Sequence, residues 1–271
     1  MFSQESTATR SVSALNLVRT GPRGAPPVIL VHPVGLDLTY WGGQVEVLCG
    51  EHDVVAYDLP GHGRSPGRPA DWTLDQAADL LAQVVRSVGS GGANLVGLSV
   101  GGMICQALTL AQPDLVRSLT LIDTAATFTE EGRAGMRARA RMAREGGMQA
   151  VLSSTLQRWF TDDTVARRPD LVDRVTKTLL ADDALVHAAM WDMISALDLV
   201  ADLHRITCPT LILVGEHDPS SPPSAARVMH QNIPRSEMHV IPNASHMAPL
   251  EKPDETNGYV VEFLRRSART R

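Results

Sequence analysis

The sequence has no uninterrupted apolar stretch long enough to cross a lipid bilayer, and its first residues show no basic segment followed by an apolar run. It also has no excess of positive charge, because 30 acidic and 25 basic side chains give a formal net charge of −5. We therefore expect neither a signal peptide nor a transmembrane helix. Nothing in the charge favours a nucleic acid or an anionic membrane as a partner.

Cysteine is scarce as well. The three cysteines, Cys49, Cys105 and Cys208, are far apart and show no C-x-x-C spacing. An odd number of widely spaced cysteines favours buried thiols over a disulfide framework or a zinc site. We therefore predict no metal ion and a reducing, cytoplasmic location.

What the sequence does contain is a globular composition, 44% hydrophobic and 20% charged, in which short apolar runs alternate with amphipathic helical segments. Runs that are apolar on both faces are typical of parallel strands covered on both sides. A helix is expected at 73–88, where Thr73 can cap its start. The alternation predicts an α/β fold with a mostly parallel sheet flanked by helices. The expected strands lie at 27–32, 53–58, 94–99, 118–123, 209–216 and 238–242.

The alternation is interrupted in the second half of the chain. Residues from about 126 to 205 show only helical patterns, and strand signals resume at Pro209. We therefore predict a core formed by residues 1–125 and 206–271, with a helical cap inserted between two strands at residues 126–205.

The segment at 94–102, NLVGLSVGG, places Ser99 between Gly97 and Gly101 where an expected strand turns into an expected helix. A turn this sharp strains its central residue and brings strand and helix together, which requires glycine on either side. The turn would hold the hydroxyl at the carboxyl edge of the sheet. A serine that only caps the helix from Val100 onward is the alternative, but that role needs no flanking glycines.

A serine hydroxyl becomes a nucleophile when a base takes its proton, and in such folds the chain order is serine, acid, histidine. Asp218 follows the expected strand at 209–216, and His246 lies in the loop after the last one. Because carboxyl ends of parallel strands share one edge, we predict that Ser99, Asp218 and His246 form a catalytic triad. Asp123, which also ends a strand, is the alternative acid.

The other histidines and acids fit less well. His217 would point away from the edge along an extended segment, and His239 alternates within a strand as a half-buried structural histidine would. Glu216 is the weaker acid because the DPSSPP turn presents Asp218 instead. Helical segments without a recognisable motif carry His187, His204 and His230.

An acyl-transfer site also needs N–H donors for an oxyanion. One donor should be Val100, the residue after the nucleophile. The other should come from the loop at 32–37, where Pro33 has no N–H and Val34 is the natural donor.

Several segments together resemble the α/β-hydrolase family over almost the whole chain: VHPVG, YDLPGHGRS, GLSVGG, LVGEHD and NASHMAPLEKP. Within that family, GLDLTYW, LQRWFTDD and ALDLVADLHRITCPTLILVGEHDPSSPP are similar to the 3-oxoadipate enol-lactonases. One departure is His32-Pro33, where these hydrolases commonly have His-Gly.

The resemblance implies a serine hydrolase without a cofactor that opens a small lactone carrying carboxylates, so its partner is a small-molecule substrate. Carbon–carbon bond hydrolases of ring-fission products, perhydrolases and general esterases share the triad and stay as alternatives, as does a ligand-binding receptor on this fold. Ser99 argues against epoxide hydrolases and haloalkane dehalogenases, which use an aspartate there. His32 and His62 are expected to stabilise loops, and a homo-oligomer stays open.

The cap holds the candidates for substrate binding. Arginines at 133, 137, 141 and 144 recur along one helical stripe. A solvated outer face is the simpler interpretation, and the sharper hypothesis is that Arg133 or Arg137 binds a substrate carboxylate. Trp159 and Met193, on apolar faces of cap helices, are core residues or walls of the pocket.

Overall fold

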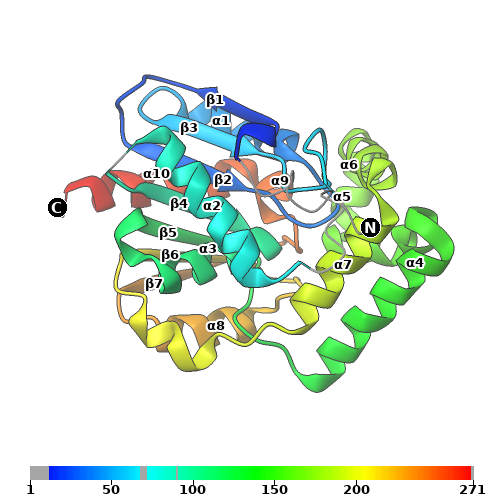
Figure 1. Cartoon of the computed structure of the whole chain (residues 1–271). Coiled ribbons are helices and arrows are strands. Elements are labelled where there is room, and N and C mark those ends of the chain that lie inside the picture. The colour runs from blue at the N-terminus through cyan, green and yellow to red at the C-terminus, as the bar shows by residue number, and fades with distance from the viewer. Residues whose placement is uncertain (1–11, 68–71, 90, 270–271) are drawn as a thin grey trace, which may run out of the picture.

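The sheet of the computed structural model, which describes residues 12–67, 72–89 and 91–269, has seven strands in the order β1-β3-β2-β4-β5-β6-β7 (Figure 1). β1 is antiparallel to β3, and the other neighbours in the sheet are parallel. The predicted α/β fold with a mostly parallel sheet is confirmed. The strands are β1 Leu17–Thr20, β2 Pro27–Val31, β3 Asp53–Tyr57, β4 Ala93–Leu98, β5 Val116–Ile122, β6 Thr210–Gly215 and β7 Ser236–Ile241.

Helices cover both faces of this sheet (Figure 1). α2 packs against α3 and α1 packs against α10. Thr73 caps the N-terminus of α2, as predicted. Its side chain accepts from Gln76 N–H, and the Gln76 side chain accepts from Thr73 N–H. The helices flanking the sheet are α1 Gly42–Leu48, α2 Leu74–Val88, α3 Val100–Ala111, α8 Pro223–Asn232, α9 Ala248–Glu251 and α10 Pro253–Arg269.

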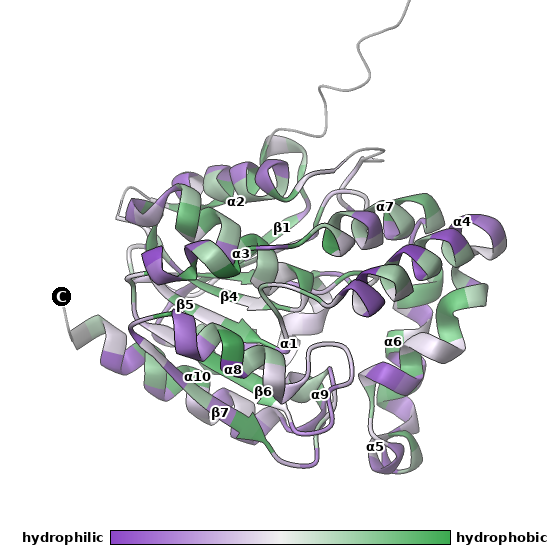
Figure 2. Cartoon of the chain, turned by 90° about the horizontal axis from the view of Figure 1, so that it is seen from below, coloured by the Kyte–Doolittle hydropathy of each residue, from purple (hydrophilic) through white to green (hydrophobic). Residues whose placement is uncertain are grey.

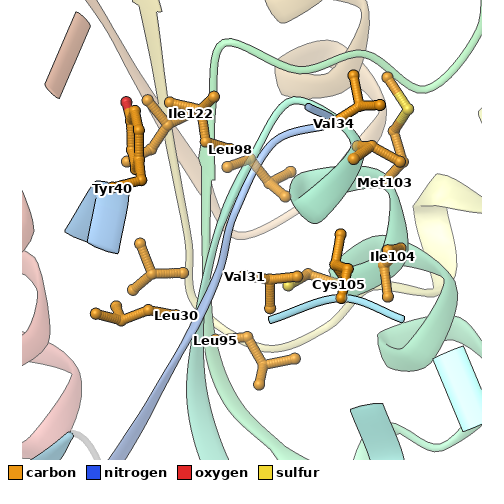
Figure 3. Packing of buried hydrophobic residues seen from close by; sticks show 14 of the residues in the cluster. Leu30, Val31, Val34, Tyr40, Leu95, Leu98, Met103, Ile104, Cys105 and Ile122 are labelled. Atoms are coloured by element: carbon orange, nitrogen blue, oxygen red, sulfur yellow. The ribbon is translucent and has the colours of Figure 1, made fainter. Parts of the chain in front are cut away.

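The central strands are buried along their whole length, which explains why their sequences are apolar on both faces. Figure 3 shows part of this core, including Leu30 and Val31 of β2, Leu95 of β4 and Cys105 of α3. Each fully buried large aliphatic side chain contributes roughly 1.5–3 kcal/mol relative to an exposed one. The core therefore fixes the carboxyl ends of β4, β5 and β6 relative to one another.

The structure describes every residue between β5 and β6. This segment forms helices and a single isolated β-bridge, from Thr127 to Asp198. α4 packs against α7 and α6, and Gly147 interrupts α4 with φ 67° and ψ −172°. These helices form a layer beside the sheet (Figure 2). They are α4 Glu130–Trp159, α5 Asp162–Arg167, α6 Pro169–Ala181 and α7 Ala184–Ser195, followed by the 3₁₀ helix η5 Val200–Arg205.

The sequence predicts that the protein has neither a transmembrane helix nor a disulfide. Within the described residues, no helix combines the length and the apolar character that a bilayer crossing demands. Cys49, Cys105 and Cys208 form no disulfide, but only Cys105 is fully buried, because the other two lie near the ends of elements at the surface. The expectation of three buried thiols is therefore wrong for Cys49 and Cys208.

Candidate active site

Ser99 lies in the turn between β4 and α3 with φ 54° and ψ −123°. A positive φ is unusual for a residue other than glycine and is found mainly where function requires a strained turn. A Cβ atom at Gly97 would lie 2.5 Å from the carbonyl carbon of Gly101, and one at Gly101 would lie 2.1 Å from the carbonyl oxygen of Val31. Both glycines are therefore required by the close approach of helix and strands. The Ser99 side chain makes no capping hydrogen bond, which removes the alternative role.

The structure brings together the three residues of the predicted triad. His246 Nε2 lies 3.0 Å from Ser99 Oγ, and His246 Nδ1 lies 2.8 Å from Asp218 Oδ2. The Asp218 carboxylate also accepts backbone N–H bonds from Ser220 and Ser221, at 2.7 and 3.1 Å. Because the carboxylate accepts from Nδ1–H, Nε2 is left without a proton and can receive the one on Oγ.

Asp123, the alternative acid, does not contact the imidazole. Its carboxylate accepts N–H bonds from Gly215 at 2.7 Å and from Ala248 at 3.1 Å. It thereby ties the end of β6 to the loop that carries His246. Burial, and then the nearby charge of Asp218, raise the pKa of Asp123 well above its usual value.

The other candidate histidines and Glu216 make their contacts with residues other than Ser99. His239 is half-buried in β7 and stacks on Tyr259 with ring centroids 4.3 Å apart, as a structural histidine would. His217 is exposed and lies beside Glu216. His204 and His230 bond to neighbouring groups on the surface.

The two residues predicted as oxyanion donors lie in two different segments, the start of α3 and the loop after β2. Val100 is the first residue of α3, and Val34 is buried in the loop after β2 (Figure 3). His32 fixes this loop, because its Nε2 accepts from Leu59 N–H at 2.8 Å and its Nδ1–H donates to Pro33 O at 2.8 Å. Burial lowers the pKa of His32 to about 3, so the imidazole is neutral. The role of the two N–H groups stays a prediction.

The loop of His246 is bonded to the cap, a connection that the sequence did not predict. Ser245 Oγ donates to Arg158 O at 2.8 Å, and Met247 N–H donates to Trp159 O at 3.1 Å. The Glu251 carboxylate accepts from Thr161 N–H at 2.8 Å and from Ser245 N–H at 2.6 Å. The cap therefore holds the residues on both sides of the candidate base.

A family model for the α/β hydrolases matches residues 28–258. The chain belongs to the α/β-hydrolase family. The chain is 26% identical to 3-oxoadipate enol-lactonase 2 of Acinetobacter baylyi over 98% of both proteins. Two solved structures are similar. The enol-lactonase from Burkholderia xenovorans has a TM-score of 0.88 at 30% identity and covers 93% of this chain and 96% of its own. A thermophilic esterase from Thermogutta terrifontis, solved with malate bound, has a TM-score of 0.87 at 32% identity over 93% of each chain.

The family and these relatives make the protein a hydrolase of ester or lactone bonds, as the sequence predicted. They do not test the individual site residues. Those rest on the geometry above and on the cap.

The structure corrects the arginines expected to bind substrate. Arg133 of this hydrolase donates to Ser195 O at 2.6 Å and to Leu197 O at 2.7 Å, so it ties together the two ends of the cap. Arg137 forms an exposed ion pair with Glu130 at 2.6 Å. The donors of Arg133 and Arg137 are therefore used within the protein, and Arg144 of the same stripe pairs with Asp192 at the surface. The simpler interpretation of that stripe is the better one.

Two other cap arginines, Arg139 and Arg158, are partly buried and are not held by an ion pair with another described residue. The Arg139 guanidinium lies 4.4 Å above the ring of Trp191. Within the part of the chain that the structure describes, the Arg158 side chain makes a single hydrogen bond, at 3.4 Å to Thr155 Oγ1, and its buried Nε has no partner. Burial lowers the pKa of Arg139 to about 10. Burial and the charge of Arg139 lower the pKa of Arg158 to about 9, and the Asp218 charge opposes that shift.

Trp159 and Met193 are buried in the hydrophobic core, at 2% and 8% exposure. Trp159 additionally holds the histidine loop through its carbonyl oxygen. A contact of either side chain with substrate stays a prediction.

Proposed function

We propose that this hydrolase acts on a small ester or lactone that carries a carboxylate, through an acyl-enzyme on Ser99. The observation that carries the proposal is the pair Arg139 and Arg158, which form none of the ion pairs found among the described residues. The two partly buried guanidinium groups repel each other, and this arrangement is unfavourable unless an anion offsets their charge. A substrate carboxylate would supply that anion and accept charge-assisted hydrogen bonds.

The names of the relatives support the same substrate class. One is a 3-oxoadipate enol-lactonase, and the esterase was solved with malate, a dicarboxylate. A short substrate is supported by the nearness of Arg158 to the triad, because the Arg158 carbonyl oxygen accepts at 2.8 Å from the hydroxyl of Ser245, the residue before His246. A small-molecule substrate as partner and a cytoplasmic location stay predictions.

In the acylation step, Ser99 Oγ attacks the carbonyl carbon while His246 Nε2 takes the hydroxyl proton. Asp218 holds the imidazole in the required tautomer and stabilises its cation. The N–H groups of Val34 and Val100 bind the oxyanion. The carbon–oxygen bond of the ester then breaks, and the leaving oxygen receives the proton from His246. An enolate leaves readily, and in a lactone it stays attached to the acyl chain.

In the deacylation step, His246 takes a proton from water as the water oxygen attacks the acyl carbon. Collapse of the second tetrahedral intermediate returns that proton to Ser99 Oγ and releases a carboxylic acid, which loses its own proton to solvent. His246 moves the proton in both the acylation and the deacylation step, so these steps call for no cofactor.

The test compares two p-nitrophenyl esters of similar shape, the anionic hemisuccinate and the neutral butyrate. We expect kcat/KM to favour the hemisuccinate by about tenfold or more, and Arg139→Gln and Arg158→Gln to remove that preference by raising KM. Ser99→Ala should lower kcat by about 10⁴-fold or more and abolish labelling by a fluorophosphonate.

Two results would count against the proposal in different ways. Equal rates on both esters, unchanged in the arginine variants, would refute the carboxylate. A folded protein whose Ser99 does not react with the fluorophosphonate would refute the acyl-enzyme and favour a ligand-binding receptor.

A further inference from the structure

A buried polar cluster connects the cap to the core outside the triad. Trp191 Nε1 lies 2.9 Å from His187 Nε2, and His187 Nδ1 lies 3.2 Å from Asp182 Oδ2. His62, in the loop after β3, places its Nε2 3.8 Å from the same carboxylate oxygen. His187 and Trp191 are 0% and 7% exposed. The reaction steps above use none of these groups.

The hydrogen bonds fix the protonation state of His187. An indole N–H can only donate, so His187 Nε2 is an unprotonated acceptor and the single proton is on Nδ1, where it is donated to Asp182. Asp182 is itself held, because its Oδ1 accepts from Asp183 N–H at 3.0 Å. The imidazole is therefore neutral and bound at both nitrogens, which leaves one orientation for its ring.

That orientation determines the position of an indole face. The rings of His187 and Trp191 meet at 68° with centroids 6.1 Å apart, and the Arg139 guanidinium lies on the Trp191 ring. An arginine on an aromatic face keeps its N–H groups available in the plane of the guanidinium. The hydrogen bond from Trp191 to His187 thus directs the donors of Arg139.

The same imidazole also touches the loop of the predicted oxyanion donor. Gly35, which follows Val34 and has φ +77°, packs so closely on the cap that a Cβ there would lie 3.1 Å from His187 Cε1. It would also lie 2.8 Å from Leu179 Cδ1 of α6. The His187 side chain therefore contacts the loop at 32–37, called the oxyanion loop here after its predicted donor. Through Trp191, His187 also positions Arg139.

We propose that His187 and Trp191 are positioning residues that set the distance between the Arg139 guanidinium and the oxyanion loop, and so determine the preference for substrates with a carboxylate. The inference rests on the proposed function, since it takes Arg139 as the group that binds the carboxylate. It adds that Arg139 binds the carboxylate well only while the hydrogen bonds from Trp191 to His187 and from His187 to Asp182 are kept.

The variants separate the two features of Trp191. Trp191→Leu removes the aromatic face, whereas Trp191→Phe keeps a face and removes the N–H that His187 accepts. Trp41→Phe is the matched control, because the Trp41 indole nitrogen is also buried but has no hydrogen-bond partner. Each variant is assayed with p-nitrophenyl hemisuccinate and p-nitrophenyl butyrate, and its fold is checked by circular dichroism and fluorophosphonate labelling.

We expect Trp191→Leu to raise KM for the hemisuccinate about tenfold, to leave its kcat within about twofold, and to leave the butyrate unchanged. Trp191→Phe should raise the KM for the hemisuccinate about threefold, because an aromatic ring stays but the hydrogen bond to His187 is lost. His187→Leu should match Trp191→Leu, and Trp41→Phe should keep the wild-type preference.

A merely structural role would lower the rates on both esters together, so a preference ratio that stays at the wild-type value in Trp191→Phe and His187→Leu overturns the inference. If Arg139→Gln abolishes the preference and these variants retain it, only the positioning fails. If Arg139→Gln has no effect, the inference fails, and if Arg158→Gln has no effect either, the proposed function fails with it. Trp191→Phe keeps the test decisive if the larger truncations do not fold.

Discussion

The carboxylate of Glu251 accepts a hydrogen bond at 2.6 Å from the backbone N–H of Ser245, the residue before the candidate base His246. Its other oxygen accepts from the N–H and the hydroxyl of Thr161, both at 2.8 Å, at the start of α5. One side chain thus bridges the cap and the histidine loop. A displacement of the cap is therefore transmitted to the imidazole by a short and partly buried connection.

Replacing Glu251 with glutamine tests this bridge. The amide offers one acceptor oxygen and one NH₂ group, so a donor would face either Ser245 N–H or Thr161 N–H. We expect the free energy of unfolding to fall by about 1–3 kcal/mol. We also expect kcat to fall about tenfold, with a smaller change in KM, because the base is misplaced.

The measurements are thermal unfolding and steady-state kinetics, with Glu262→Gln as the matched control. Glu262 is exposed on α10, where its carboxylate lies 3.8 Å from Arg266. If Glu251→Gln behaves like Glu262→Gln in both measurements, the bridge has no role in placing the base.

The turn at Ser99 gives a second prediction, which compares two glycines. Gly101→Ala should destabilise the protein by at least about 3 kcal/mol and abolish activity, because the added Cβ would lie 2.1 Å from Val31 O. Gly258→Ala in α10 has open space around the new Cβ and should stabilise the protein by about 0.5–1 kcal/mol. Urea unfolding of both variants measures the difference, and similar values would contradict the packing argument.

Much of this site could be predicted because it depends on local pattern and on topology. The apolar runs identified β2 to β7 but not the edge strand β1, and the carboxyl ends of parallel strands must share an edge. That is enough to bring Ser99, Asp218 and His246 together from distant parts of the chain. The glycines beside Ser99 then distinguish a strained turn from an ordinary helix start.

The arginine proposed to bind the substrate could not be predicted by the same means. Helical spacing groups Arg133 with Arg137, but it does not say which face of α4 turns inward, and only tertiary packing places Arg139 on Trp191. The break at Gly147, with φ 67°, changes the course of α4 before it reaches Arg158. A single helical wheel therefore cannot relate the two arginines to each other.

The buried neutral imidazole of His32 predicts how stability depends on pH. Burial lowers its pKa in the folded protein to about 3, whereas in the unfolded chain it is near the usual value of about 6.5. Between these values the unfolded state binds the extra proton, so the free energy of unfolding falls as the pH is lowered. At pH 4 the loss from this one residue should reach about 3 kcal/mol relative to pH 7.

His32→Gln isolates that contribution, because the amide can accept from Leu59 N–H and donate to Pro33 O as the imidazole does. We expect the variant to be close to the wild type in stability at pH 7, and to lose less of its stability between pH 6 and pH 4. Urea unfolding at several pH values gives both slopes. Parallel slopes for the two proteins would mean that His32 is protonated in the folded state as readily as in the unfolded chain, and that burial does not keep this imidazole neutral.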